Sequence, residues 1–149
     1  MTDPADPAGP IGDAEHRYEA RATTTGTGMA VIHTRQSVVP FDSSPRQGAE
    51  LPGPADLLTS AFAACMIKNV ERMGELLPFN FESATVDVYA ERQDNPPKIS
   101  RITYALTVVT DEPDHRVDLL HRNIQRHSTI FNTLAAACDV NGTVTATRG

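Results

Sequence analysis

The sequence lacks several features that would narrow its function quickly. It has no tryptophan, only two cysteines and 5% aromatic residues among 149 positions. No apolar run approaches the length of a membrane span, so we expect no membrane association. Lysine and arginine total 13 against 19 acidic residues, a net charge of −6, which argues against nucleic acid as a partner. No secretion signal is visible, so we expect a cytoplasmic location, where free thiols persist.

The motifs of metal sites and hydrolases are missing as well. The five histidines are scattered and form no HExxH pattern, and Cys65 and Cys138 form no CxxC pair. Thr59 and Ser60 lack the GxSxG surroundings of a hydrolase nucleophile. The sequence therefore predicts no metal site and no cofactor.

The first third of the chain is predicted to be a tail followed by short strands. Residues 1–13 are rich in Pro, Gly, Asp and Ala and predict a mobile tail, which leaves residues 14–149 as the folded domain. Alternating apolar and polar residues predict three strands before a polar loop from Asp42 to Gly53. The expected strands are His16–Thr24, Met29–Arg35 and Ser37–Phe41, with a turn at Gly26–Gly28.

The region after Pro78 predicts strands first and helices afterwards. Two alternating runs around the turn Asp94–Pro97 predict an antiparallel hairpin, and helical spacing follows an expected N-cap at Asp114. Segregated hairpins and helices indicate an α+β fold and argue against a doubly wound sheet. In order, the expected elements are strands Phe79–Gln93 and Ile99–Thr110, helices His115–His127 and Phe131–Ala135 with a break near Ser128, a turn at Asn141-Gly142, and a strand Thr143–Thr147.

The most informative stretch is the helix expected from Gly53 to Leu77. Pro54 suits the first helical turn, Asp56 places a negative charge near the positive end of the helix dipole, and Pro78 ends the helix. Its middle is apolar or small on nearly all sides, which predicts a buried central helix. Cys65 lies in that middle segment.

Cys65 has two interpretations. Free cysteine is among the most buried residue types, so a small core hydrophobe is the simpler one. A reactive thiol would need a nearby cation or other donor, because an apolar environment keeps a thiol protonated. The candidate cations are Arg21, Arg35 and Arg46. Cys138 is interpreted as core packing.

Three stretches form a distinctive combination: Pro54-Ala55-Asp56-Leu57-Leu58 running on to Ala63-Ala64-Cys65, the loop Asp42–Gly53, and Asn132-Thr133-Leu134. From about Tyr18 onward the chain resembles the OsmC/Ohr family of thiol-dependent peroxide reductases. The resemblance implies an OsmC-like fold, with antiparallel sheets around a buried central helix. It also implies that Cys65 is the residue that attacks peroxide.

A homodimer is expected on two grounds. A helix that is apolar on all sides needs cover all round, and an isolated hairpin such as His16–Arg35 is marginal in water until it pairs with something. The family resemblance implies the same arrangement, with two intertwined chains and the active sites at their interface.

The chain also departs from the family's pattern. Ser128 stands where the family has its resolving cysteine, so the intramolecular disulfide cycle is expected to be broken. Asp56 is the acid that remains at the family's acidic position. The family's early arginine is missing from the turn at Gly26–Gly28, and Arg21 is its candidate substitute.

Two hypotheses about function follow. The first is an enzyme that reduces organic hydroperoxides, with Cys65, Asp56 and Arg21 as catalytic residues and an external thiol as reductant. The second is a family member without peroxidase activity that binds an apolar ligand, or senses thiol oxidation, at the same cavity. The intact Cys65 favours the first, whereas the missing resolving cysteine and the missing arginine both favour the second. The expected pocket residues are Leu58, Phe62, Met66 and Ser128.

Overall fold

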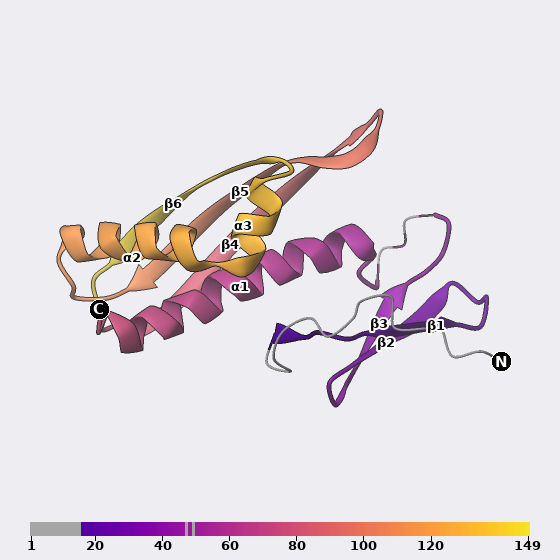
Figure 1. The fold of residues 1–149 in the computed structure, drawn as a ribbon, viewed down its shortest axis with the longest axis horizontal. Helices are drawn as coiled ribbons and strands as arrows, with labels where there is room; N and C mark the ends of the chain where they lie inside the picture. Colours follow the sequence, from indigo (N-terminus) through magenta and orange to yellow (C-terminus); the bar gives the residue numbers. More distant parts are fainter. Residues whose placement is uncertain (1–15, 47, 49) are drawn as a thin grey trace. The chain divides into compact units, whose positions relative to one another are not determined.

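The computed structural model describes residues 16–46, 48 and 50–149. These residues fall into two compact parts that divide at Pro54, and each part has its own sheet (Figure 1). The expected mobile tail, residues 1–13, lies outside the described residues. Among the described residues, no helix combines the length and apolar character that crossing a bilayer requires.

The first part is a three-stranded antiparallel sheet. It consists of β1 (Arg21–Thr24), β2 (Met29–Thr34) and β3 (Ser37–Asp42), in the order β1-β2-β3. All three expected strands are confirmed, although β1 begins at Arg21 rather than His16. Gly26 and Gly28 adopt positive φ angles in the β1–β2 turn.

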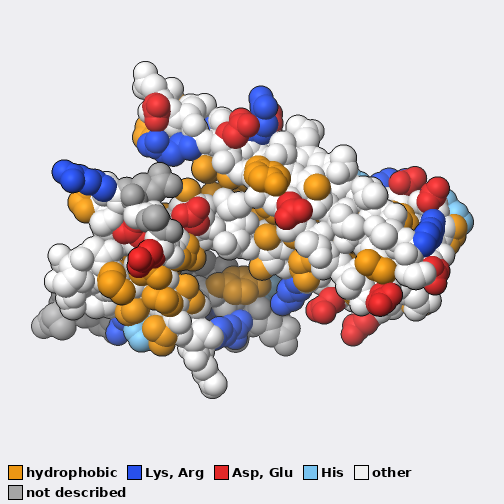
Figure 2. All heavy atoms as spheres, turned by 180° about the vertical axis from the view of Figure 1, so that it is seen from behind, with side chains coloured by type: hydrophobic (Ala, Val, Ile, Leu, Met, Phe, Trp, Pro, Cys, Tyr) orange, Lys and Arg blue, Asp and Glu red, His pale blue; other side chains and the backbone are white. Residues whose placement is uncertain are grey.

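The sheet of the first part has almost no core of its own. Ala30 is its single buried residue among those described, whereas Met29 and Val38 are 64% and 58% exposed. In Figure 2 hydrophobic side chains gather at the surface over this part of the chain. Such a patch normally needs cover.

The second part contains the long helix and a mixed sheet. Its elements are α1 (Pro54–Leu76), β4 (Ser83–Asp94), β5 (Pro97–Val109), α2 (Asp114–His127), α3 (Thr129–Ala135) and β6 (Asp139–Thr147). The antiparallel β4–β5 hairpin is confirmed, and β6 joins β5 in parallel to give the order β4-β5-β6. The crossover from β5 to β6 consists of α2 and α3, as a parallel connection requires. The α+β class is therefore confirmed.

The core of the second part lies between one face of this sheet and the helices (Figure 1). Alternation along β5 buries every second side chain, from Ile102 to Val108, and leaves the residues between them exposed. Helical spacing on α1 and α2 supplies the other side of the core. The buried helical residues are Phe62, Met66, Val70 and Met73 of α1 and Val117, Leu120 and Ile124 of α2.

Two local predictions are wrong. Asn141 and Gly142 form no turn but lie inside β6, because Gly142 pairs with Tyr104 on β5 and packs against its ring. A Cβ at Gly142 would lie 2.4 Å from that ring, so the glycine serves a close approach. Asp114 is the first residue of α2 rather than its N-cap, which is Pro113; the Asp114 carboxylate binds Arg148 at 3.2 Å.

The central helix is confirmed but is buried on one face. Phe62, Met66 and Val70 are fully buried, whereas Ala61 and Ala64 on the same helix are exposed. Among the described residues nothing covers these two alanines. The expectation of cover on all sides is therefore not met by this chain alone.

Candidate functional site

Cys65 is a free, partly buried cysteine in the middle of α1. Its described hydrogen-bond partner is Asn69, one turn further along the helix. The Asn69 amide nitrogen lies 2.8 Å from the Cys65 carbonyl oxygen and 3.6 Å from the Cys65 sulfur. The thiol thus lies at the border between the buried and the exposed face of the helix, beside a polar donor.

The expected pocket residues of α1 are mostly in the core. Phe62 and Met66 are fully buried, and Leu58 is partly buried. Phe62 contacts the rings of Tyr104 and Phe131 at centroid distances of 5.8 and 5.9 Å. The apolar side chains next to Cys65 therefore belong to a packed aromatic cluster.

Asp56 is exposed in the first turn of α1, and its backbone carbonyl accepts a hydrogen bond from the Ser60 hydroxyl at 2.7 Å. Helical geometry places Asp56 roughly 13 Å along the axis from Cys65 and on the opposite side of the helix. The structure therefore does not bring this carboxylate to the thiol along α1.

The three candidate cations, Arg21, Arg35 and Arg46, all lie in the first part of the chain, and all three are exposed. Arg35 lies between β2 and β3 with a φ of 52°, so the β2–β3 turn itself uses a left-handed residue. Cys65 lies in the second part. Within that part, the donor at the thiol is the amide of Asn69.

Ser128 lies at the junction of α2 and α3 and is fully buried. Its hydroxyl donates to the carbonyl oxygen of Ile124, and its own carbonyl accepts the Asn132 N–H at 2.9 Å. The expected break near this residue is confirmed. The Ser128 hydroxyl is therefore bonded within its own helical segment and is not exposed to solvent.

Cys138 packs against the core cluster just before β6, as its interpretation as core packing predicted. Its thiol lies 3.3 Å from the carbonyl oxygen of Leu134, and burial raises its pKa, an effect that Lys98 opposes. Cys138 is thus a partly buried side chain of the core packing.

A polar cluster in the core was not predicted. The Tyr104 hydroxyl lies 2.6 Å from His121 Nε2 and accepts a hydrogen bond from Gln125 at 3.1 Å. Burial raises the pKa of Tyr104 and lowers the pKa of His121. The only signal in the sequence was the polar residues at 121 and 125 on the apolar side of α2.

Comparison with known proteins assigns the family. The family model for OsmC-like protein matches residues 47–142, which include α1, β4, β5, α2 and α3. The chain belongs to the OsmC-like family. No curated protein sequence matches this chain.

Solved structures agree with the fold of this OsmC-like chain. An OsmC-like protein from Mycoplasma pneumoniae is 17% identical with a TM-score of 0.81, and the match covers 89% of this chain and 98% of that one. An organic hydroperoxide resistance protein OsmC from Legionella pneumophila is 16% identical (TM-score 0.72; coverage 89% and 99%). The organic hydroperoxide resistance protein OhrB of Bacillus subtilis is also 16% identical (TM-score 0.66; coverage 89% and 100%).

A groove of about 710 Å³ runs between α1 and the edge strand β4. The side chains on its walls are mostly small or aliphatic, and the exposed Ala64 beside Cys65 is one of them. The groove is open and lies in the second part of the chain. It is lined by Ala63, Ala64, Ile67, Lys68, Glu71, Ala84, Thr85 and Val86.

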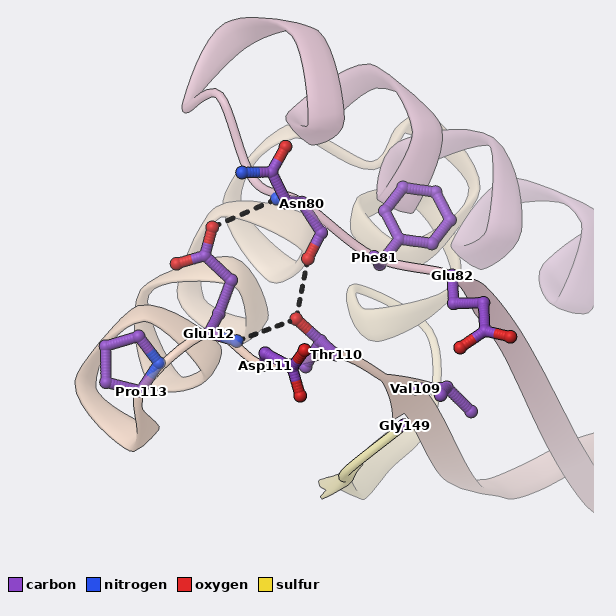
Figure 3. A pocket seen from close by; sticks show the side chains of 9 residues that line it. All are labelled: Asn80, Phe81, Glu82, Val109, Thr110, Asp111, Glu112, Pro113 and Gly149. Carbon is purple, nitrogen blue, oxygen red and sulfur yellow. Dashed lines mark hydrogen bonds between the residues drawn. The ribbon is translucent and has the colours of Figure 1, made fainter.

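A second cavity, of about 460 Å³, lies where β4 begins and β5 ends (Figure 3). Its polar groups satisfy one another: Glu112 accepts the Asn80 N–H at 3.0 Å, and Thr110 donates to the Asn80 carbonyl at 2.6 Å. The Asn80 N–H, helped by Arg116, lowers the pKa of Glu112. These bonds join two loops beyond the C-terminal end of α1, more than two helical turns past Cys65.

Within residues 16–46, 48 and 50–149, no three His, Cys, Asp or Glu side chains are grouped so that they could hold a metal ion.

Proposed function

We propose that this protein reduces organic hydroperoxides through Cys65. The observation that carries the proposal is a free, partly exposed thiol in the middle of α1, within the segment matched by the OsmC-like family model. Relatives of similar fold include two organic hydroperoxide resistance proteins. The small and aliphatic side chains that line the groove beside Cys65 favour an organic substrate over a strongly hydrated one.

The first step is a two-electron oxidation of sulfur. The Cys65 thiolate attacks the terminal oxygen of the hydroperoxide; an S–O bond forms and the O–O bond breaks. The alkoxide that leaves takes up a proton and becomes an alcohol, and Cys65 becomes a sulfenic acid. Cys65 is thereby the only protein residue whose oxidation state changes.

The second step requires a reductant from outside the chain. A small thiol condenses with the sulfenic acid, which releases water and forms a mixed disulfide; a second thiol then exchanges with it and restores the Cys65 thiol. The buried hydroxyl of Ser128 cannot take this part. Cys138 is a poor candidate because burial raises its pKa and its thiol is bonded to the Leu134 carbonyl.

A non-peroxidase role at the same site is the alternative. It is favoured by the Ser128 hydroxyl, which is bonded to Ile124 at the position where an intramolecular disulfide cycle would need a thiol. Such a protein would bind an apolar ligand or register oxidation of Cys65 without turnover. Steady consumption of hydroperoxide in the presence of a dithiol distinguishes the two roles.

We also propose that the protein is a homodimer. The exposed alanines of α1, the open groove beside β4 and the exposed apolar side chains of the first sheet all need cover. The edge strands of both three-stranded sheets also present unpaired backbone groups. A second copy of the chain would satisfy these needs together.

Mass spectrometry after one equivalent of cumene hydroperoxide tests the enzymatic proposal. Wild-type protein and the Cys138→Ser variant should each gain one oxygen atom, or a mixed disulfide when a small thiol is present. The Cys65→Ser variant should remain unmodified. A Cys65–Cys138 disulfide as the main product, or a wild-type protein that does not react, would contradict the proposed cycle.

A further inference from the structure

Asn69 is a polar residue on the buried face of α1. It is 6% exposed, and the residues around it on this face, Met66, Val70 and Met73, are apolar and buried. An amide in such surroundings is unfavourable unless its hydrogen bonds are satisfied. The amide nitrogen of Asn69 has both of its described partners on one residue, Cys65.

The geometry fixes which end of the amide approaches the thiol. A carbonyl oxygen can only accept a hydrogen bond, so the group 2.8 Å from the Cys65 carbonyl must be the NH₂ group of Asn69. That nitrogen carries two hydrogens, and the carbonyl uses one of them. The second is available to the Cys65 sulfur, 3.6 Å away.

We propose that Asn69 is a positioning residue that stabilises the thiolate of Cys65. The inference rests on the proposed function, because it concerns the sulfur that attacks the hydroperoxide. An anion accepts a hydrogen bond more strongly than a neutral S–H group, so the second N–H favours the ionised thiol. The bond to the backbone carbonyl holds the amide in place before ionisation, so little reorganisation is needed.

The charged groups around this face do not supply the same effect. Among the buried or half-buried titratable side chains of β5 and α2, Tyr104 is bonded to His121 and Arg116 to Glu112. The charges that follow Cys65 on α1 are exposed and screened by solvent; they are Lys68, Glu71 and Arg72.

The test measures how readily Cys65 is alkylated by iodoacetamide as a function of pH, in a Cys138→Ser background. Leucine is close to asparagine in size and has no donor. Asn69→Leu should lower the rate of alkylation about tenfold at a fixed pH near neutrality and move the midpoint of the alkylation curve to higher pH, because one hydrogen bond to the thiolate is lost. The rate of oxidation by cumene hydroperoxide should fall by about the same factor.

Thr59→Val is the matched control. The Thr59 hydroxyl donates to the carbonyl of Ala55, also four residues earlier on α1, at 2.8 Å. Its loss removes the same kind of helix bond without touching Cys65, so the midpoint should stay in place. A folded Asn69→Leu protein with an unchanged midpoint would overturn the proposal.

A second variant keeps the test decisive if Asn69→Leu does not fold. Asn69→Asp keeps the shape but replaces the donor with an acceptor, so it should raise the midpoint at least as far, and no shift would again overturn the proposal. Alkylation needs no peroxide. If Cys65 of the wild-type protein does not react with cumene hydroperoxide, the proposed function is contradicted. The effect of Asn69 on alkylation can still be measured in that case.

Discussion

The two parts of the chain differ in how they bury apolar surface. The first, β1–β3, has Ala30 as its one buried residue among those described, whereas the second encloses a continuous cluster from Phe62 to Ile124. A three-stranded sheet without a core is marginal in water, but a sheet covered by helices is not. This difference in burial supports the proposed homodimer, in which a second copy of the chain would cover the first part.

The same contrast applies to the chemistry. Cys65 and its amide donor lie in the part with a core, where packing fixes their geometry. The arginines proposed from the sequence lie in the part without one. The thiol and its amide donor therefore come from one helix, whereas the three candidate arginines belong to the other part of the chain.

The largest expected effect comes from dilution. If the first part is covered by a second chain, separating the chains should cost secondary structure and Cys65 reactivity together, because no stable folded monomer is expected. Light scattering and circular dichroism over a dilution series measure both. A folded, reactive monomer at micromolar concentration would show that the first part needs no partner.

The second-largest effect should come from truncating a core side chain, which compares the stability contributions of the two parts. Phe62→Ala removes a fully buried ring and should lower the free energy of unfolding by about 3–5 kcal/mol. Val38→Ala, at a position of β3 that is 58% exposed in the single chain, removes less buried surface and should cost less than Phe62→Ala even where a second copy covers it. Denaturant titrations at one protein concentration give both values. Equal losses would mean that the contrast in burial does not hold in solution.

The sequence predicted most of the fold because the patterns were local. Alternation gave β4 and β5, and the apolar helix between Pro54 and Leu76 was bounded by its prolines. The turn expected at Asn141-Gly142 failed for a nonlocal reason. Position 142 requires a glycine because the ring of Tyr104, on another strand, packs directly on it. No local sequence rule distinguishes such a glycine from one in a turn.

The site was predictable only in its nucleophile. Cys65 stood out by its place in the helix, but the role of Asn69 depends on which face of α1 is buried, and the sequence predicted burial on every face. An amide four residues from the cysteine was the available signal. The arginines were chosen by charge alone, and charge does not fix which side chain approaches the sulfur.

Gly142 offers a sharper probe of the well-packed part. A methyl group there would lie 2.4 Å from the Tyr104 ring, which Phe62 and Phe131 also contact, so the ring cannot move aside freely. Gly142→Ala should therefore cost about 1–3 kcal/mol in unfolding free energy.

Gly74→Ala is the control for that substitution. In α1 the nearest atom to the new methyl group lies 3.2 Å away, on Phe81, and alanine gains helix propensity. This variant should be close to neutral. A Gly142→Ala protein as stable as the Gly74→Ala protein would mean that the β5–β6 contact is looser than the structure has it.

The smallest expected effect is a pH dependence that belongs to the second part alone. Burial lowers the pKa of His121, and Asp118 only partly opposes this. The neutral His121 ring can accept a hydrogen bond from the Tyr104 hydroxyl at Nε2, whereas the protonated ring has no acceptor. As the pH falls, His121 is protonated near pH 6.5 in the unfolded chain and only at a lower pH in the folded chain. The free energy of unfolding should therefore fall as the pH drops below about 6.5, by at most about 1.4 kcal/mol per pH unit.

His121→Gln should flatten this slope, because glutamine keeps an acceptor for Tyr104 and does not titrate. His127→Gln, at an exposed position of the same helix, should leave the slope unchanged. Denaturant titrations between about pH 5 and 7 isolate the effect from the two carboxylates with lowered pKa values. These carboxylates are Asp42, which accepts hydrogen bonds from Ser44 and Gly48, and Glu112. Their contributions to the free energy of unfolding are lost only as the pH falls to the ordinary carboxylate range and below it. Equal slopes in wild type and His121→Gln would mean that the Tyr104–His121 bond does not distinguish the two protonation states.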